Sequence, residues 1–173
     1  MLSWKQSMQW KKGLIEVENI NQFVVFRVGI EEYAIPILRV NEIIRLKGVS
    51  ITKVPNTKKE VIGIINLRGE VIPIIDFRLK FNMQEKEPDD SNRIIIVNLP
   101  DKNIGFMVDS VSEVVQIEEE DIAKPPEEIS DINSKYITGV AKYKDRIFII
   151  LDIDIITGDT KNTEGGLKID EEY

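Results

Sequence analysis

The sequence QFVVFRVGIEEYAIPILRVNEII at residues 22–44 aligns without a gap on RIIIVNLPDKNIGFMVDSVSEVV at residues 93–115 when the chain is shifted by 71 positions. Polar and turn positions coincide as well as apolar ones, and the match continues through Glu42/Glu113, Lys53/Lys124 and Pro55/Pro126. After five inserted residues the shift becomes 76 and pairs Gly63/Gly139, Arg68/Lys144, Gly69/Asp145 and Asp76/Asp152. Any two Ile/Val-rich segments align to some degree, but hydrophobic alternation does not fix the polar positions. The pattern therefore indicates an internal duplication.

The apolar residues occur in short runs rich in Ile and Val, which favours strands over helices. The expected strands are Phe23–Val28, Tyr33–Leu38, Ile62–Leu67, Val71–Ile75, Arg93–Leu99, Ile104–Val108, Tyr136–Ala141 and Ile147–Leu151. Most connections are too short for a crossover helix, so we expect antiparallel sheets. The sequence predicts a mainly β fold with two small barrels of about five strands each and short helical turns.

The polar segment Gln84–Asn92 separates the two copies and is the best candidate for an internal boundary. It divides the predicted domain, residues 22–157, into subdomains at about 22–83 and about 93–157, and it leaves open whether they exchange strands. Residues 1–21 are polar and are expected to form a variable N-terminal arm. Residues 158–173 combine glycines with a net acidic balance, which predicts a disordered acidic tail.

The composition excludes several classes of protein. The chain has 173 residues, with 23 basic and 30 acidic side chains, no Cys and no His. Disulfides, a thiolate nucleophile and Cys-ligated metals are therefore excluded, and the commonest general base is missing. A net charge of −7 opposes a nucleic-acid partner, which needs a basic face. No apolar run approaches the roughly 20 residues of a membrane span and no signal peptide is recognisable, so we expect a soluble cytoplasmic protein.

Charge divides unequally between the two copies. Residues 39–80 contain nine basic and four acidic side chains, whereas residues 109–131 contain nine acidic side chains and only Lys124 as a base. Solvated faces without a role are one explanation. The alternative is that each copy meets a different partner surface, because charge asymmetry orients association.

Carboxylates at strand ends are the candidates for acid–base chemistry. Asp76 and Asp152 occupy equivalent positions before short segments that can form helical turns, so we interpret them as strand-end or N-cap residues; Asp109 ends a third strand. The run Glu118–Asp121 lacks the alternating ligands and central Gly of a Ca²⁺ loop. The loop at residues 66–69 matches no phosphate-binding fingerprint. We predict no enzyme activity, no metal and no cofactor.

The hairpin VIGIINLRGEVIPIID, residues 61–76, places Arg68 at its turn beside Gly69, whose freedom at positive φ suits a tight turn. Pro36 and Pro73 cannot donate to a β-ladder, so their strands are expected at sheet edges or bulges. A turn-tip Arg is usually just solvated. In an apolar hairpin, however, its planar guanidinium is also suited to anchor a protein interface.

Three segments resemble the CheW family, the coupling proteins of bacterial chemotaxis. They are FVVFRVGIEEYAIPILRVNEII, VIGIINLRGEVIPIIDFRLKF, and IGFMVDSVSEVVQI followed by YITGVAKYKDRIFIILDIDII, and they cover about residues 20–157 in order. The resemblance implies two SH3-like β-barrel subdomains around a shared core. It also implies a non-catalytic adaptor that bridges the cytoplasmic tip of chemoreceptors (methyl-accepting chemotaxis proteins) to the regulatory domain of the chemotaxis histidine kinase. Such a protein is cytoplasmic, is recruited to membrane-associated receptor arrays and does not insert into the membrane.

The resemblance implies a receptor-binding site as well. Carried over by motif position, the site consists of Val40, Glu42, Ile43, Gly63, Asn66, Arg68 and Gly69, while the kinase-binding residues stay unknown. Simpler explanations exist: Val40 can belong to the core, Gly63 can permit a bulge, and Glu42 can pair with Arg39 or Arg45. Because Glu113 repeats Glu42 in the second copy, a receptor-specific role for Glu42 is weakened, and Arg68 is the strongest candidate.

Other functions compete with this one. A coupling protein of a related receptor–kinase pathway, such as surface motility, would have the same sequence features. A nucleic-acid-binding β-barrel would need aromatic and basic side chains exposed together, which are scarce in this acidic chain. A small-molecule hydrolase would need perturbed carboxylates in a polar pocket.

Overall fold

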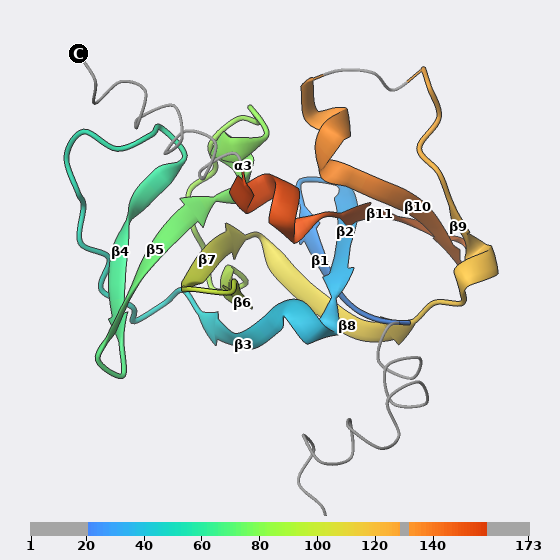
Figure 1. Ribbon diagram of the computed structural model, residues 1–173. Coiled ribbons are helices and arrows are strands. Elements are labelled where there is room, and N and C mark those ends of the chain that lie inside the picture. Colours follow the sequence, from blue (N-terminus) through green and yellow to red (C-terminus); the bar gives the residue numbers. More distant parts are fainter. Residues whose placement is uncertain (1–20, 129–131, 159–173) are drawn as a thin grey trace, which may run out of the picture.

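The computed structural model describes residues 21–128 and 132–158, and its strands form two β-sheets (Figure 1). The N-terminal arm and the acidic tail that the sequence predicts lie almost entirely outside the described residues. The strands are β1 (Gln22–Val28), β2 (Glu31–Pro36), β3 (Val40–Arg45), β4 (Val61–Leu67), β5 (Glu70–Asp76), β6 (Arg93–Asn98), β7 (Asn103–Val108), β8 (Ser110–Gln116), β9 (Ile122–Ala123), β10 (Ile137–Tyr143) and β11 (Arg146–Leu151). The helical turns are η1 (Ile37–Arg39), α3 (Phe77–Lys80), η2 (Glu119–Asp121), η3 (Ile132–Tyr136) and residues 153–158.

The first sheet has the strand order β3-β6-β7-β5-β4 and takes all its strands from residues 40–108; we call it barrel 1. The barrel closes where the connection between β3 and β4 pairs with β4 itself. There the N–H of Thr52 donates to the carbonyl of Ile64 at 2.9 Å, and the N–H of Ile64 donates back at 2.8 Å. The interior of barrel 1 contains buried isoleucines from β4, β5 and β6, namely Ile65, Ile72, Ile74, Ile94 and Ile96.

The second sheet has the order β8-β1-β2-β11-β10-β9 and is called barrel 2. Its closing strand β9 has only two residues, which pair with Val140 and Ala141 of β10. In the repeat, β9 corresponds to residues 51–52, so equivalent segments of the two copies close the two barrels. Five full strands and a short closing pair agree with the predicted mainly β, two-barrel fold class.

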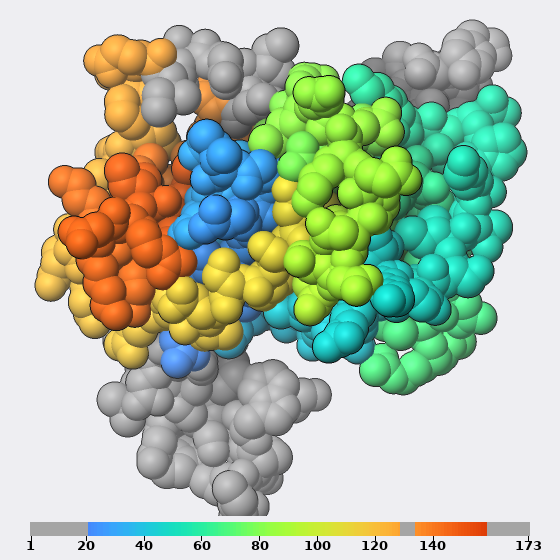
Figure 2. Space-filling model, turned by 180° about the vertical axis from the view of Figure 1, so that it is seen from behind, coloured from blue at the N-terminus to red at the C-terminus, as the bar shows by residue number. Residues whose placement is uncertain are grey.

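The two barrels do not coincide with the two copies of the repeat. Strands β1 and β2 of the first copy pair with β8 and β11 of the second, so strands are exchanged between the copies. The chain crosses between the barrels at η1 and at Asp109. The segment Gln84–Asn92, expected to be the boundary, instead connects β5 to β6 within barrel 1, and it lies on the molecular surface (yellow-green in Figure 2).

The duplication is visible in the irregularities of the strands. The register of β3 shifts between Val40 and Glu42, and that of β8 shifts at the equivalent place, where Val111 and Glu113 face adjacent residues of β1. A second shift, between residues 61 and 63 of β4, recurs between residues 137 and 139 of β10. Bulges at matching positions support descent of both copies from one unit.

A single hydrophobic cluster joins the barrels. It contains buried side chains of β1 and β2 from barrel 2, and of β5, β6 and β7 from barrel 1. Phe77, 1% exposed, packs against Phe26, Tyr33 and Phe81 with ring centroids 5.3, 4.8 and 4.4 Å away. Because both barrels contribute to this cluster, separating them would expose apolar side chains of each.

Several details differ from the sequence prediction. Two pairs of strands, β2 with β11 and β5 with β7, are parallel, because strand exchange makes neighbours of segments that are distant in the chain. The strand expected to reach Leu38 ends at Pro36, and Tyr136 belongs to η3 instead of a strand. Strands β3 and β8 were not expected. Pro73 lies in the interior strand β5, where the ladder to β7 begins only at Ile74.

Candidate protein-interaction site

The turn between β4 and β5 contains two successive residues with positive φ, Arg68 at 51° and Gly69 at 87°. This combination is typical of the tight two-residue turns that match the twist of a β-hairpin. The sequence predicted positive φ only for Gly69. The side-chain oxygen of Asn66 accepts a hydrogen bond from the Gly69 N–H at 2.9 Å, which holds the turn in place. Lys144, in the equivalent turn of barrel 2, also has positive φ, at 56°, so this conformation is a property of the tight turn in both copies.

Arg68 forms an ion pair with Glu42 of β3. Nη1 donates to Oε1 at 2.7 Å and Nη2 donates to Oε2 at 3.0 Å. The hydrogen bond from Arg68 lowers the pKa of Glu42, so the carboxylate stays ionised. The side chain of Arg68 is 71% exposed and that of Glu42 is 26% exposed. Neither Arg39 nor Arg45, the partners considered from the sequence, takes this position, because closure of barrel 1 brings Arg68 to Glu42.

The other predicted residues divide into two groups. Ile43 is exposed on β3 next to Glu42, and Asn66 and Gly69 lie in the exposed hairpin turn. In contrast, Val40 packs against the shared cluster, and Gly63 is buried with φ 151°. A Cβ at Gly63 would lie 2.4 Å from the carbonyl oxygen of Thr52. The structure thus brings Arg68 to Glu42 and leaves Ile43, Asn66 and Gly69 exposed, whereas Val40 is partly buried and Gly63 is buried.

The second copy contains a related but different arrangement. Glu113 accepts a hydrogen bond of 2.8 Å from Arg146, which also donates to Glu32 at 2.9 and 3.1 Å. Arg146 stands where the first copy has Glu70, and the turn residue Lys144 lies over the ring of Tyr143. Gly139 repeats the role of Gly63, since a Cβ there would lie 2.7 Å from the side chain of Ile122. The turn-tip pair of Arg68 and Glu42 therefore distinguishes barrel 1 from barrel 2.

Sequence reasoning missed Val71, which lies opposite Asn66 in the hairpin and is 62% exposed. A continuous apolar run suggests that all its members are buried. The alternation of side chains between the two faces of β5 could have predicted its exposure. Ile72 and Ile74 are buried in the barrel, whereas Val71 points away from the barrel interior.

The strand-end carboxylates have structural roles. The side chain of Asp76 accepts a hydrogen bond from the Arg78 N–H at 2.9 Å, and Asp152 accepts one from the Ile155 N–H at 3.1 Å. Both are N-caps of the helical turns that follow, as predicted. Asp109 bonds to Arg78. In the part of the chain that the structure describes, no group of three or more acidic side chains is arranged to hold a metal ion.

Two small barrels that share a core and present an exposed polar and apolar face form the kind of scaffold that binds other proteins. A family model for the CheW-like domain matches residues 22–161. Chemotaxis protein CheW of Helicobacter pylori is 40% identical over 139 residues, which are 80% of this chain and 82% of that protein. Chemotaxis protein CheW of Bacillus subtilis is 33% identical over 141 residues, covering 82% and 89%.

The fold is also shared with a solved structure. The crystal structure of the scaffolding protein TtCheW from Thermoanaerobacter tengcongensis is similar with a TM-score of 0.72 at 38% identity, over 79% of this chain and 91% of that chain. The chain belongs to the CheW-like family, which confirms the resemblance of its three segments. It is a non-catalytic adaptor of chemotaxis, and its relatives do not favour the surface-motility or nucleic-acid alternatives. Among the helices of residues 21–128 and 132–158, none has the length and apolar character that a transmembrane helix needs.

Proposed function

We propose that this adaptor binds the cytoplasmic tip of a chemoreceptor through the outer face of barrel 1, around the β4–β5 turn. The receptor face, as we call it, consists of Glu42, Ile43, Asn66, Arg68, Gly69 and Val71. The main support is the exposed ion pair in which Arg68 donates two hydrogen bonds to Glu42. Two apolar side chains add to it: Ile43 follows Glu42 in β3, Val71 lies opposite Asn66 in the hairpin, and both are exposed.

An oriented Arg is well suited to recognise a protein surface. Glu42 holds the guanidinium in one plane through two hydrogen bonds, which reduces the side-chain entropy lost on binding. A guanidinium has five N–H donors, so the pair with Glu42 leaves donors for a partner. Arg and apolar side chains are enriched at the centres of protein interfaces.

Val40 and Gly63 support the receptor face from below. Gly63 allows residues 51–52 to approach β4 and close the barrel, and Val40 joins the face to the shared core. Substitutions at these two positions would therefore weaken receptor binding by moving β3 and the hairpin relative to each other.

The second proposed partner is the regulatory domain of the chemotaxis histidine kinase, bound on a surface that leaves the receptor face free. Opposite charge balances in residues 39–80 and 109–131 support separate partner surfaces, because each favours a differently charged partner. Simultaneous binding would recruit the protein from the cytoplasm to membrane-associated receptor arrays.

Co-sedimentation tests this function directly. The full chain is mixed with a receptor cytoplasmic fragment assembled on vesicles and with the kinase, and both the pellet and the kinase activity are measured. We expect the kinase to enter the pellet, with altered activity, only when the adaptor is present. Kinase that pellets equally well without the adaptor, or adaptor that stays in the supernatant, would contradict the proposal.

A further inference from the structure

The connection between the barrels is concentrated at the two places where the chain crosses from one sheet to the other. The first crossing is η1, between β2 and β3, and the second is Asp109, between β7 and β8. At each crossing, a charged side chain forms hydrogen bonds with a charged side chain on a helical turn. Each of these turns follows a β-hairpin, formed by β4 and β5 in barrel 1 and by β10 and β11 in barrel 2. These turns are α3 after β5 and residues 153–158 after β11, the red segment between the two sheets in Figure 1.

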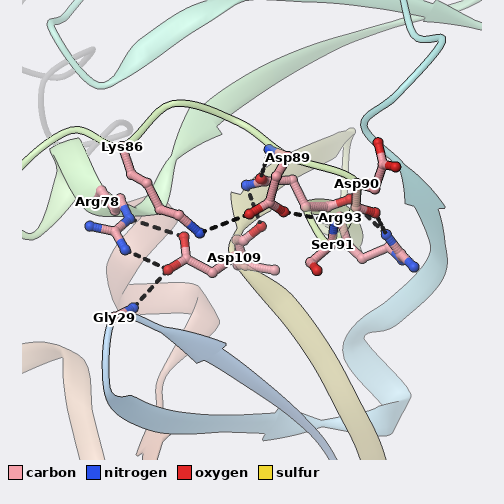
Figure 3. Close-up of polar contacts among 10 residues, drawn as sticks. Gly29, Arg78, Lys86, Asp89, Asp90, Ser91, Arg93 and Asp109 are labelled. Carbon is pink, nitrogen blue, oxygen red and sulfur yellow. Dashed lines mark hydrogen bonds and ion pairs between the residues drawn. The ribbon is translucent and has the colours of Figure 1, made fainter.

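At the second crossing, three groups converge on the carboxylate of Asp109 (Figure 3). The Gly29 N–H of barrel 2 donates to it at 2.8 Å, and Nε and Nη2 of Arg78 donate at 3.0 and 2.5 Å. The side chains of Arg78 and Asp109 are only 16% and 12% exposed. Nη1 of Arg78 also donates to the carbonyl of Gln84 at 2.9 Å, which fixes the connector to the same junction.

At the first crossing, the charges are reversed. Here the crossing carries the cation: Nη1 and Nη2 of Arg39 donate to the two oxygens of Asp154 at 3.0 and 2.8 Å. Nη2 of Arg39 also donates to the carbonyl of Asn98 in barrel 1 at 3.1 Å. The pair therefore joins the helical turn of barrel 2 to the end of β6.

The two ion pairs occupy equivalent places in the duplicated sequence. A shift of 76 takes Arg78 onto Asp154, and a shift of 71 takes Arg39 to within one residue of Asp109. In both pairs a helical turn from one copy meets the crossing from the other copy. If each turn met the crossing of its own copy, Arg78 would face Arg39 and Asp154 would face Asp109. Like charges would oppose that arrangement at both junctions.

We propose that the opposite polarity of the Arg39–Asp154 and Arg78–Asp109 pairs specifies the exchange of strands between the copies and thereby holds the two barrels in one orientation. Two similar copies in one chain offer competing pairings, and a sequence specifies one of them by penalising the other. This inference does not rest on the proposed receptor contact, because both pairs lie at the junctions between barrels.

Charge-swap variants test the inference. The side chains of Arg39 and Asp154 are 26% and 68% exposed, so single reversals, Arg39→Asp or Asp154→Arg, should lower the melting temperature by about 2–4 °C, since each places like charges together. The double swap Arg39→Asp/Asp154→Arg restores attraction and should recover the melting temperature to within about 1 °C. It also makes both crossings acidic and both helical turns basic, so the competing pairing is no longer repelled.

The decisive measurement is therefore the number of different arrangements of the two barrels that each variant adopts after refolding. Because the chain has no Cys, spin labels on Lys53→Cys in barrel 1 and Lys142→Cys in barrel 2 report a single distance between the barrels. We expect one distance for the unaltered charges, two distances or an added oligomer for the double swap, and one distance again for the quadruple swap that adds Arg78→Asp/Asp109→Arg. Lys47→Asp, in the exposed pair of Lys47 and Asp90 within barrel 1, is the control and should change nothing.

A double swap that refolds to the same single distance as the unaltered protein would overturn the inference, because polarity would then be irrelevant. Should the double swap fail to fold, the quadruple swap decides, since opposite polarity is restored at both junctions. A quadruple swap that folds to the single distance supports the inference, and one that does not fold contradicts it.

Discussion

Arg68 at the β4–β5 turn and Glu42 on β3 are joined by two hydrogen bonds of 2.7 and 3.0 Å, although 26 positions separate them in the chain. Strands β3 and β4 lie at opposite edges of the strand order of barrel 1. The pair therefore spans the seam at which the barrel closes. Because closure of the barrel places Glu42 beside the turn, it also fixes the orientation of the exposed Arg68 guanidinium.

We expect Glu42→Gln to weaken binding to a receptor fragment several-fold while leaving the melting temperature nearly unchanged. The amide removes the charge that fixes the Arg68 guanidinium, and exposed ion pairs contribute little to stability. Calorimetric titration of the receptor fragment measures the change. Glu113→Gln is the matched control, because Arg146 keeps Glu32 as a partner there. Equal weakening by both substitutions would rule out a special role for barrel 1.

Gly63→Ala is expected to lower the free energy of unfolding by about 2–4 kcal/mol, because the added Cβ combines overpacking with strain at positive φ. The contact is with backbone, the Thr52 carbonyl at 2.4 Å, and cannot be relieved by a side-chain rotation. Urea denaturation gives the value. Gly48→Ala provides the control, since Gly48 also has positive φ but a methyl group there would enter open space among the described residues. A loss no larger than that of Gly48→Ala would refute the steric account.

We expect the two barrels to unfold together in one calorimetric transition, because the cluster around Phe77 takes side chains from both. Phe77→Ala should lower the free energy of unfolding by about 3–5 kcal/mol, as for other buried aromatic residues, and the transition should stay single. Leu38→Ala, at an exposed position, serves as the control. Two resolved transitions, of which Phe77→Ala shifts only one, would show that the barrels fold independently.

Acid should destabilise the fold partly through Asp109. Burial raises the pKa of this carboxyl, but hydrogen bonds from Arg78 and Gly29 outweigh burial and leave the pKa below its usual value. Below about pH 4 the unfolded chain therefore binds a proton that the folded protein does not, and stability falls as the pH falls. In Asp109→Asn the free energy of unfolding should depend less steeply on pH between about 4 and 2.

The carboxyl of Asp76 has the opposite effect on the pH dependence of stability, so it serves as the comparison for Asp109. Burial raises the pKa of Asp76 despite its backbone hydrogen bonds, so its contribution to stability decreases as the pH rises above about 4. Asp76→Asn, which keeps an oxygen for the N-cap, should therefore make the loss of stability on acidification steeper. Identical pH dependence in both variants would contradict the assignment.

The sequence predicted local structure better than pairing. Runs such as residues 93–98 were recognised as strands because nearly all their members are buried, whereas β3 and β8 alternate apolar with polar residues and interrupt the pattern at a bulge. The N-caps Asp76 and Asp152 were predictable because the cap and its helical turn are adjacent in the chain. Parallel pairing of β2 with β11 was not, since it depends on strand exchange.

The candidate site shows the same limit. The turn at Arg68 and Gly69 follows from the local sequence, and the family resemblance supplied the list of positions. The partner of Glu42 did not follow, because Arg39 and Arg45 are closer in the chain and only barrel closure brings Arg68 to it. Exposure of Val71 and burial of Gly63 likewise depend on which face of each strand the barrel encloses.

The most direct test of the receptor face is the affinity of Arg68→Glu for a receptor cytoplasmic fragment, measured beside Lys144→Glu. Reversal at Arg68 removes the anchor and places a second negative charge beside Glu42, so we expect affinity to fall at least about tenfold while kinase binding persists. Lys144 occupies the equivalent turn of barrel 2, and its reversal should leave receptor affinity unchanged. Equal losses from both would mean that overall positive charge attracts the receptor, and unchanged affinity in Arg68→Glu would contradict the receptor face altogether.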